Sequence, residues 1–403
     1  MRRAETVISK RQSFRKLACH SLLAALTLFC GCAASAEDTT ESVDRLFEKI
    51  SDDPVLLRVF LRHMPKGGDL HNHASGTPHA EEYLEWAADS AFCVTSTTGS
   101  ISRPPCDSEG ETLAQNLMRS DPKLYADLVD SLSVRELLAG VDTDQSGHNQ
   151  FFASFGKFLA IVSEEPDRTL ASVKTLAAND ALSYVELMFN PGTIDRYATT
   201  TTDPDWDEGD LDAAFERFKP AIPALVEQSI TERDKTELEA ASLLGCDDAN
   251  APAACDVVVY YNTYGLRLLP NDQLFRHLAL GFALIEADPR FLGASLVEPE
   301  DDPRAVENYD LHMRMIAYLK KQFPHVRVSL HAGELALGRA PSYAMRDHIR
   351  KAIDIAGSER IGHGVDIAWE LHSRETLSMM ATEKIAVEIN LSSNDVILGV
   401  RGA

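Results

Sequence analysis

The sequence predicts an α/β fold, a (β/α)8 barrel of the TIM type, because short apolar runs alternate with long amphipathic stretches along its 403 residues. The short runs are rich in β-branched residues and have the length of buried strands. The long stretches repeat apolar residues at helical spacing. Repeated βα units favour a parallel sheet, and eight such units close a barrel.

Seven of the short runs are predicted strands. They lie at Gly68–His73, Ser183–Phe189, Asp256–Tyr261, Leu292–Val297, Val326–His331, Arg360–His363 and Ile385–Asn390. Amphipathic patterns predict helices that follow the later strands. These helices lie at Pro270–Ala287, Pro303–Gln322, Ser342–Ala356 and Leu371–Glu383.

A long insertion, residues 74–182, separates the first two predicted strands. It is far too long for a plain crossover between parallel strands. Helical patterns run over Asp121–Val141 and Asn149–Val162 within it. We expect the insertion to form a cap over the site.

Residues 1–36 have the composition of a secretory signal peptide. Six basic residues precede an apolar run from Leu17 to Cys32, and the small-x-small sequence Ala34-Ser35-Ala36 follows. The apolar run is shorter than the roughly 20 residues of a membrane-spanning helix. Cleavage after Ala36 would leave residues 37–403 as an exported barrel domain, either periplasmic or secreted. The alternative is lipid attachment at Cys32 in the cell envelope, because the residues before it loosely resemble a lipobox.

Four cysteines remain beyond the signal segment: Cys93, Cys106, Cys246 and Cys255. An even number of cysteines in an exported chain predicts two disulfides. The sequence-local pairs Cys93–Cys106 and Cys246–Cys255 would each close a short loop. Four buried thiols are the alternative.

The chain is strongly acidic, and its formal net charge of -23 becomes -28 when the six basic residues and one acid of residues 1–36 are removed. Such a surface argues against partners such as nucleic acid or anionic membranes. The acidity is sufficient to keep an exported protein in solution.

The strongest chemical motif is Gly68-Asp69-Leu70-His71-Asn72-His73, at the end of the first predicted strand. Side chains two residues apart on a strand point to the same face, so His71 and His73 can bind one metal ion. With 13 histidines in the chain, a His-x-His pattern by itself is weak evidence.

Two further motifs strengthen this interpretation. The segment Ser-Leu-His-Ala-Gly-Glu ends the fifth predicted strand with His331 and Glu334, and Gly-His-Gly ends the sixth with His363. The carboxyl ends of barrel strands gather on one face. Three neutral histidines leave a zinc position open for water, whose pKa the metal lowers towards neutrality. The residues therefore predict a hydrolytic site with one zinc ion.

These motifs, in this order, resemble those of the adenosine deaminase family of metal-dependent amidohydrolases. The resemblance implies that His71, His73 and His331 bind zinc. It also implies that Glu334 protonates the purine ring nitrogen and that His363 orients and deprotonates the attacking water.

The segment Met64-Pro65-Lys66-Gly67-Gly68, the long insertion and the export signal are more similar to the secreted, growth-factor-related branch of that family. This branch implies an extracellular or periplasmic purine nucleoside as substrate. It also implies a homodimer formed through the insertion.

Aromatic residues recur at helical spacing in the insertion, at Phe151, Phe152, Phe155 and Phe158. In the resembled family such residues line the nucleoside pocket, which makes Phe152 and Phe155 candidates for substrate binding. Ordinary core packing is the alternative.

The chain departs from the family pattern at two other candidate substrate-binding residues. Ser75 stands where the compact enzymes have an aspartate that binds ribose, and Glu298 stands where the family has a glycine close to the purine. Glu298 could alternatively bind a second metal ion, in which case the site would hold two metal ions instead of one.

The largest departure concerns the family's eighth strand, which carries adjacent aspartates for zinc and purine. Nine residues follow Asn394, and Asp395 lies too close to the seventh predicted strand to replace that pair. We therefore expect that this sequence is incomplete, because strand 8 is absent from it, and that a chain truncated in this way is inactive or unstable.

Three functions are compatible with these residues. The first is zinc-dependent hydrolytic deamination of adenosine, or a close aminopurine nucleoside, to inosine and ammonia. The second is deamination of another adenine compound, such as a nucleotide, free adenine or a modified nucleoside. The third is extracellular nucleoside binding without turnover.

Overall fold

The structure is a computed structural model that describes residues 42–138 and 146–400. The predicted signal peptide and the lipid alternative at Cys32 fall outside the described residues. The chain divides into two units, Met1–Pro65 and Lys66–Ala403, and each is described by itself. None of the helices in the described ranges is long and apolar enough to cross a membrane.

The described part of the first unit consists of helical residues 42–50 and α2 (Pro54–His63). The carboxylate of Asp53 caps α2, since it accepts hydrogen bonds from the backbone N–H groups of Val55 and Leu56. The rings of Phe47 and Phe60 lie 5.8 Å apart, so aromatic contact joins the two helices.

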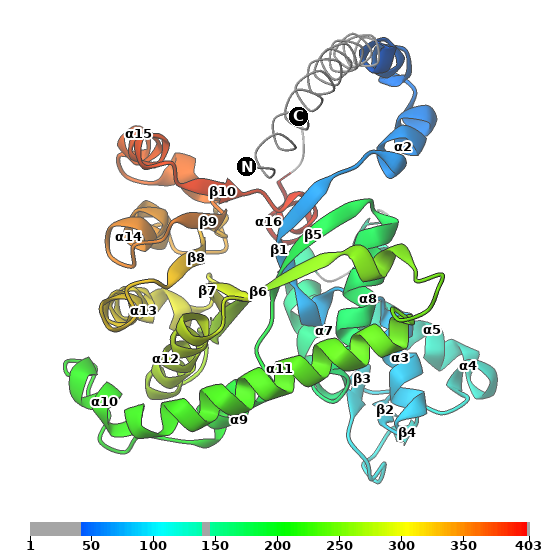
Figure 1. Cartoon of the computed structure of the whole chain (residues 1–403), viewed down its shortest axis with the longest axis horizontal. Coiled ribbons are helices and arrows are strands. Elements are labelled where there is room, and N and C mark those ends of the chain that lie inside the picture. The colour runs from blue at the N-terminus through cyan, green and yellow to red at the C-terminus, as the bar shows by residue number, and fades with distance from the viewer. Residues whose placement is uncertain (1–41, 139–145, 401–403) are drawn as a thin grey trace, which may run out of the picture. The chain divides into compact units, whose positions relative to one another are not determined.

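The second unit is built on one parallel sheet of seven strands, in the order β1-β5-β6-β7-β8-β9-β10. The strands curl into a nearly closed barrel (Figure 1). In the described residues no backbone ladder joins β10 to β1. The strands are β1 (Gly67–His73), β5 (Leu182–Met188), β6 (Val258–Leu266), β7 (Phe291–Val297), β8 (Arg327–Ala332), β9 (Arg360–His363) and β10 (Ala386–Glu388).

All seven predicted strands are confirmed, and the clearest error is the predicted end of β6 at Tyr261. The strand continues to Leu266. The prediction stopped early because Asn262 and Thr263 are polar, yet both side chains are buried, Asn262 inside the barrel and Thr263 against Gly281 of the helix that follows β6. The amide of Asn262 donates a hydrogen bond to Glu186 Oε2 at 3.3 Å, so a polar partner inside the barrel compensates for its burial.

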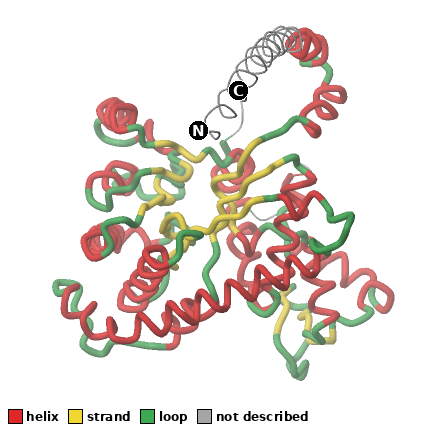
Figure 2. The backbone as a smooth tube through the Cα atoms, viewed as in Figure 1, coloured by secondary structure: helices red, strands yellow, loops and turns green. Residues whose placement is uncertain are grey.

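Helices cover the outside of the strands (Figure 2). Their inward faces and the strands share one apolar core, in which Leu274, Phe282, Ile316 and Leu330 are almost fully buried. The helices are α9 (Gly192–Thr200), α10 (Leu211–Phe218), α11 (Ile222–Leu244), α12 (Asn271–Ala287), α13 (Pro303–Gln322), α14 (His348–Asp354), α15 (Ser373–Glu383) and α16 (Leu391–Leu398).

The helix predicted over Ser342–Ala356 is wrong in its first half. A 3-10 turn covers Ala344–Arg346, and α14 begins only at His348. The start is fixed by the carboxylate of Glu370, which accepts hydrogen bonds from the backbone N–H groups of Ile349 and Arg350. A carboxylate from a distant segment thus caps the helix, and the local pattern does not reveal it.

The insertion between β1 and β5 contains a small antiparallel sheet, in the order β3-β2-β4, that was not predicted. It has its own apolar cluster, which includes Tyr83, Trp86, Leu128 and Phe158. Its elements are α3 (Ala80–Asp89), β2 (Cys93–Thr95), β3 (Ser100–Ser102), β4 (Glu111–Leu113), α4 (Leu117–Ser120), α5 (Pro122–Ser131), α6 (Arg135–Leu138), α7 (Gly147–Val162) and α8 (Pro166–Asn179).

Disulfides join Cys93 to Cys106 and Cys246 to Cys255, which confirms both predicted pairs. The first bond ties β2 to the loop that follows β3. The second closes the loop that follows α11.

The helix predicted over Asp121–Val141 is interrupted, because α5 ends at Ser131 and α6 is a separate short helix. The side-chain amide of Gln150 donates hydrogen bonds to the carbonyls of Asp130, Ser131 and Ser133. These bonds satisfy carbonyls at the helix end and stop it there. Residues 139–141 of the prediction fall outside the described residues.

Helix α7 contacts loops that follow several barrel strands. The His148 imidazole lies 3.0 Å from Asp301 Oδ1 after β7, and Arg339 after β8 donates to Ser146 Oγ at 2.7 Å. The ring of Phe155 lies against Gly76, which follows β1, and α7 also contacts α16, which follows β10. All these loops leave the carboxyl ends of parallel strands, so α7 packs at that end of the barrel.

Candidate metal centre and its surroundings

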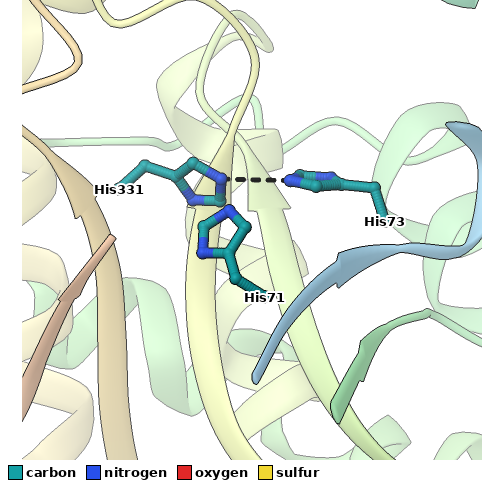
Figure 3. Close-up of side chains that lie close together, drawn as sticks. All are labelled: His71, His73 and His331. Carbon is teal, nitrogen blue, oxygen red and sulfur yellow. Dashed lines mark hydrogen bonds between the residues drawn. The ribbon is translucent and has the colours of Figure 1, made fainter. Parts of the chain in front are cut away.

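Three histidines from two barrel strands meet at one point. His71 and His73 end β1, and His331 is the penultimate residue of β8. One ring nitrogen from each lies within 4.8 Å of the others, which is the spacing that one metal ion requires (Figure 3). The Nε2 atoms of His73 and His331 are 3.1 Å apart. The structure thus brings together the three predicted ligands.

The end of β1 is irregular, and this irregularity helps to present the two histidines. The pairing register between β1 and β5 shifts between Asp69 and Asn72. The Asp69 carboxylate accepts hydrogen bonds from the backbone N–H of His71 and from the side-chain amide of Asn72. A bulge of this kind re-aims side chains at a strand end. The rings of His71 and His73 are 5.4 Å apart.

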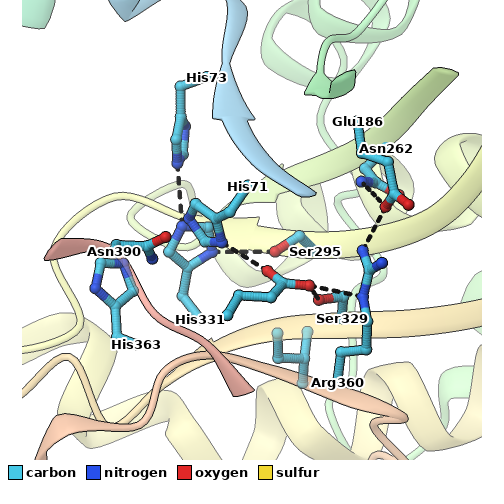
Figure 4. Close-up of polar contacts among 12 residues, drawn as sticks. His71, His73, Glu186, Asn262, Ser295, Ser329, His331, Arg360, His363 and Asn390 are labelled. Carbon is cyan, nitrogen blue, oxygen red and sulfur yellow. Dashed lines mark hydrogen bonds and ion pairs between the residues drawn. The ribbon is translucent and has the colours of Figure 1, made fainter. Parts of the chain in front are cut away.

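Hydrogen bonds orient two of the three imidazoles (Figure 4). His71 Nδ1 lies 2.7 Å from Glu388 Oε2, and His331 Nδ1 lies 3.1 Å from the hydroxyl of Ser295. With Nδ1 occupied by these partners, Nε2 is the ring nitrogen left for a metal. Such outer hydrogen bonds fix the tautomer and orientation of metal-binding histidines.

Two of the three histidines, His73 and His331, are held in the neutral form, which is the form that binds a metal. Desolvation and the neighbouring His71 and His363 lower the pKa of His73 to about 3. Burial also holds the pKa of His331 well below its usual value. Three imidazoles with nitrogens at this spacing fit zinc, which accepts histidine nitrogen in an open site.

The carboxylate of Glu388 connects His71 to a polar chain that crosses the barrel interior. Its Oε1 accepts from Ser329 Oγ at 2.7 Å and lies 2.6 Å from Arg360 Nε. Arg360 also pairs with Glu186 on β5 at 2.5 Å. Burial raises the pKa of Glu388, but the hydrogen bond with His71 and the charge of Arg360 bring it below its usual value. The partner of His71 is therefore ionised.

Glu334 and His363 lie beside the three histidines. Glu334 Oε1 is 3.4 Å from His363 Nε2, and both side chains are almost fully buried. Burial, followed by the charge of Glu300, raises the pKa of Glu334 to about 8, so this carboxyl carries a proton at neutral pH. Burial lowers the pKa of His363, whose Nδ1 lies 2.8 Å from Asn394 Oδ1. The pair therefore combines a neutral acid with a neutral base.

Left-handed backbone conformations occur at the ends of strands around this site. His363 at the end of β9 has a φ of 69°, and Glu298 directly after β7 has a φ of 79°. Non-glycine residues rarely adopt such angles, and they cluster at functional sites. Gly333 between His331 and Glu334 has a φ of 75°, and a Cβ there would lie 2.5 Å from Asp366 Oδ1. The motif therefore requires glycine at this position.

The two departures from the family pattern have distinct environments. Ser75 lies half-buried in the 3-10 turn Ala74–Gly76, and its carbonyl accepts a hydrogen bond from Tyr83. The Glu298 carboxylate accepts from the backbone N–H of Leu268 at 2.8 Å. Glu298 is outside the histidine group, which is the metal-ligand cluster found among the described residues. The alternative role of Glu298 as a second-metal ligand gains no support.

The four phenylalanines of α7 divide between core and surface. Phe158 is buried and stacks on Tyr83 with a centroid distance of 4.5 Å, as in ordinary core packing. Phe151, Phe152 and Phe155 are half-buried, and the ring of Phe151 contacts both of the others. Their partial exposure leaves aromatic surface available at the carboxyl end of the barrel.

The sequence analysis missed the residues that support the site. They are Arg267, Ser295, Glu300, Ser329, Arg360, Glu388 and Asn394, several of which are buried. A detectable signal was present for some of them. A charged residue inside an otherwise apolar strand, such as Glu388, must find a partner when it is buried.

Fold and site together define a parallel α/β barrel with a histidine cluster suited to zinc at its strand ends. No protein-family model matches the chain, and no curated protein matches it. Solved structures do match it. The chain is similar to the N6-mAMP deaminase of Arabidopsis, with 16% identity and a TM-score of 0.49 over 84% of this chain and 75% of the other.

Two further solved structures are similar to the chain. An apo structure of the N6-methyl-AMP deaminase from Arabidopsis thaliana has 16% identity and a TM-score of 0.47, over 84% of this chain and 74% of the other. A zinc-bound amidohydrolase from Burkholderia ambifaria has 14% identity and a TM-score of 0.43, over 82% of this chain and 66% of the other.

Proposed function

We propose that this protein is a zinc-dependent hydrolase that deaminates adenosine, or a close aminopurine nucleoside, to inosine and ammonia. The observation that carries the proposal is the meeting of three histidines with the Glu334–His363 pair, whose facing atoms are 3.4 Å apart. Hydrolysis at a purine carbon requires a metal site for water, a general acid and a general base, and a protonated carboxyl and a neutral imidazole beside the metal position can fill the last two roles.

His71, His73 and His331 would hold the zinc ion, which supplies an acidified water near neutral pH. His363 accepts a proton through Nε2, because Asn394 Oδ1 occupies its Nδ1–H. Glu334 donates its proton to the ring nitrogen next to the amino-bearing carbon. This protonation stabilises the addition product before ammonia leaves. In the net reaction, water replaces the amino group.

The pocket would be completed by the insertion. Phe152 and Phe155 offer half-buried rings on α7, which packs at the carboxyl end of the barrel where the histidines lie. Aromatic surface of this kind suits a flat purine. We therefore propose that α7 is the cap over the site.

The test is turnover of adenosine by the zinc-loaded protein, followed by loss of adenosine absorbance and release of ammonia. Glu334→Gln should lower kcat by about 1,000-fold, which is within the range for loss of a general acid, and should retain zinc. Glu383→Gln, an exposed position on α15, is the matched control. Robust turnover by the Glu334 variant would refute the proposed mechanism.

A second candidate is deamination of another adenine compound. Glu298 favours this candidate. It stands where the resembled family has a glycine, adopts a left-handed backbone conformation, and adds a carboxylate beside the strand ends. Ser75 is a shorter ribose-binding group than the aspartate of the resembled family. Comparing kcat/KM for adenosine, AMP, adenine and N6-methylated forms would separate the two. A clear preference for adenosine would exclude this candidate.

We also propose that the mature chain is exported, as in the secreted branch of the resembled family, with cleavage after Ala36. The two disulfides support export, because disulfides persist in oxidising compartments. N-terminal sequencing and intact mass of protein from the cell envelope and medium would test this proposal. A lipid mass at Cys32 would instead support anchoring, and an intact Met1 would contradict both.

A further inference from the structure

We propose that Glu300 is a positioning residue for Glu334, holding the segment that carries the acid against the metal centre. This inference rests on the proposed function, because it concerns the residue that donates the proton. Glu300 follows β7, three residues after Val297, and none of the sequence motifs includes it.

Glu300 contacts the segment that connects the predicted metal ligand His331 to the acid Glu334. Its Oε2 accepts a hydrogen bond from the backbone N–H of Glu334 at 2.8 Å, and its Oε1 accepts from the backbone N–H of Gly333 at 3.2 Å. Two successive amides are therefore bound by one carboxylate. The backbone of Glu334 cannot rotate without breaking at least one of these bonds.

Glu300 is itself fixed by His348 at the start of α14. His348 Nδ1 lies 2.7 Å from Glu300 Oε1, and the imidazole stacks on Tyr309 with a centroid distance of 3.6 Å. The exposed fractions of Glu300 and His348 are 1% and 3%. Burial alone raises the pKa of Glu300, but the hydrogen bond and charge of His348 bring it below its usual value. Glu300 is thus an ionised, buried carboxylate that is hydrogen-bonded to Gly333, Glu334 and His348.

A buried cation holds the other end of the same segment. Arg267 follows β6, and its Nη2 donates to the carbonyls of His331 and Leu296 at 3.2 Å each. Its exposed fraction is 2%. The segment from His331 to Glu334 therefore lies between a cation that binds its first carbonyl and an anion that binds its last two amides. Their contacts fix the ligand and the acid relative to each other.

Glutamine cannot replace Glu300 at this position. An amide side chain has one acceptor oxygen, and its NH2 group would face either the Glu334 amide or the Gly333 amide, both of which are donors. Glu300→Gln therefore changes charge and acceptor count with almost no change in volume. It releases one end of the segment without opening a cavity.

The experiment compares Glu300→Gln with Glu232→Gln as a matched control. Glu232 also accepts a hydrogen bond from a backbone N–H, that of Thr193 at 2.8 Å, but it lies on α11 and caps α9. We expect Glu300→Gln to lower kcat by about 100-fold, with KM and zinc content nearly unchanged, because a small displacement of a reacting group has such effects. The Glu232 variant should keep the wild-type kcat.

Amide hydrogen exchange gives a readout that does not depend on activity. In Glu300→Gln, exchange should become faster at Gly333 and Glu334 but remain slow in α12. Unchanged exchange there, or wild-type kcat, would overturn the positioning role. An equal loss of kcat, zinc and protection throughout the barrel would also overturn it, because that is the result of a structural role alone. Absence of turnover in wild type would refute only the proposed function, since exchange still decides the positioning role.

If Glu300→Gln does not fold, His348→Phe takes its place. Phenylalanine keeps a ring to stack on Tyr309 and removes the hydrogen bond to Glu300. We expect a fall in kcat of about 10-fold and faster exchange at Gly333 and Glu334, as expected for loss of one supporting hydrogen bond. Unchanged kcat and exchange in this variant would overturn the proposal.

Discussion

The histidine centre and the insertion are built in opposite ways. Around the centre, the functional side chains lie at strand ends or just after them, and two of the histidines have hydrogen-bonding partners on other strands, His71 with Glu388 and His331 with Ser295. The insertion instead has its own apolar cluster and a disulfide, and the ring of Phe151 contacts those of Phe152 and Phe155 on the same helix. The centre depends on the sheet, whereas the insertion is a separately stabilised element.

The difference indicates how each region responds to substitution. Polar changes at the centre leave buried groups without partners, which is costly because such groups cannot turn to water. Changes in the insertion remove apolar contact or a cross-link, and their effects remain local. The predictions below test this contrast, from the largest expected effect to the smallest.

The largest effect is expected from loss of a metal ligand. His73→Ala removes one of the three nitrogens, so we expect zinc binding and turnover to fall below detection. Metal content and kcat, measured after loading with zinc, check this prediction. His372→Ala, an exposed histidine on the same unit, is the control. Stoichiometric zinc in the His73 variant would contradict the assigned ligands.

A smaller loss is expected when the partner of a ligand is changed. Glu388→Gln replaces the ionised partner of His71, and we expect zinc affinity to fall by about 10- to 100-fold. Competition with a chelator measures this change. Equal affinity in variant and wild type would show that the orientation of His71 does not depend on Glu388.

The pH dependence of turnover should follow Glu334. Its pKa is raised to about 8, and the protonated form is the donor. Turnover should therefore be constant below that pH and fall by about tenfold for each unit above it. A profile of kcat from about pH 6 to about pH 10 tests this sign. A rate that rises through pH 8 would assign the opposite protonation state to the acid.

In the insertion, loss of a cross-link should affect stability more than chemistry. Replacing Cys93 and Cys106 together by serine opens a loop with a sequence separation of 13. We expect the free energy of unfolding of the insertion to fall by about 3 kcal/mol, while zinc affinity is unchanged. Denaturant unfolding and zinc titration of the variant would show whether the two regions are independent.

The smallest effect is expected from one ring of α7. Phe152→Ala should raise KM by about tenfold and leave kcat nearly unchanged, because a pocket wall contributes to binding alone. Leu159→Ala, on the exposed side of the same helix, is the control. Unchanged KM in the Phe152 variant would place the pocket elsewhere.

The sequence predicted the parts of this protein that depend on periodicity and on short motifs. The strand starts were located within two residues, and the three ligands His71, His73 and His331 converge as expected. Two residues on one strand share a face whatever the rest of the chain does. The disulfide pairs were likewise predictable because their partners are close in sequence.

The parts that were missed depend on contacts between distant segments. Glu370 sets the start of α14, and Gln150 stops α5 from a position 19 residues after Ser131. Glu300 and Glu388 were missed for the same reason, since their partners are distant in sequence. A single sequence carries no information on which buried carboxylate meets which amide. The small sheet β3-β2-β4 was missed because strands of three residues are too short to show alternation.

The contact between His71 and Glu388 also has a consequence for the barrel as a ring. His71 belongs to β1 and Glu388 to β10, the first and last strands of the sheet order, between which the described residues form no backbone ladder. The side chains of His71 and Glu388 thus connect β1 to β10, where no backbone hydrogen bonds of the described residues do so. Zinc would hold His71 in place and so strengthen the connection between β1 and β10. Because a ligand that binds the folded state stabilises that state, zinc should raise the melting temperature.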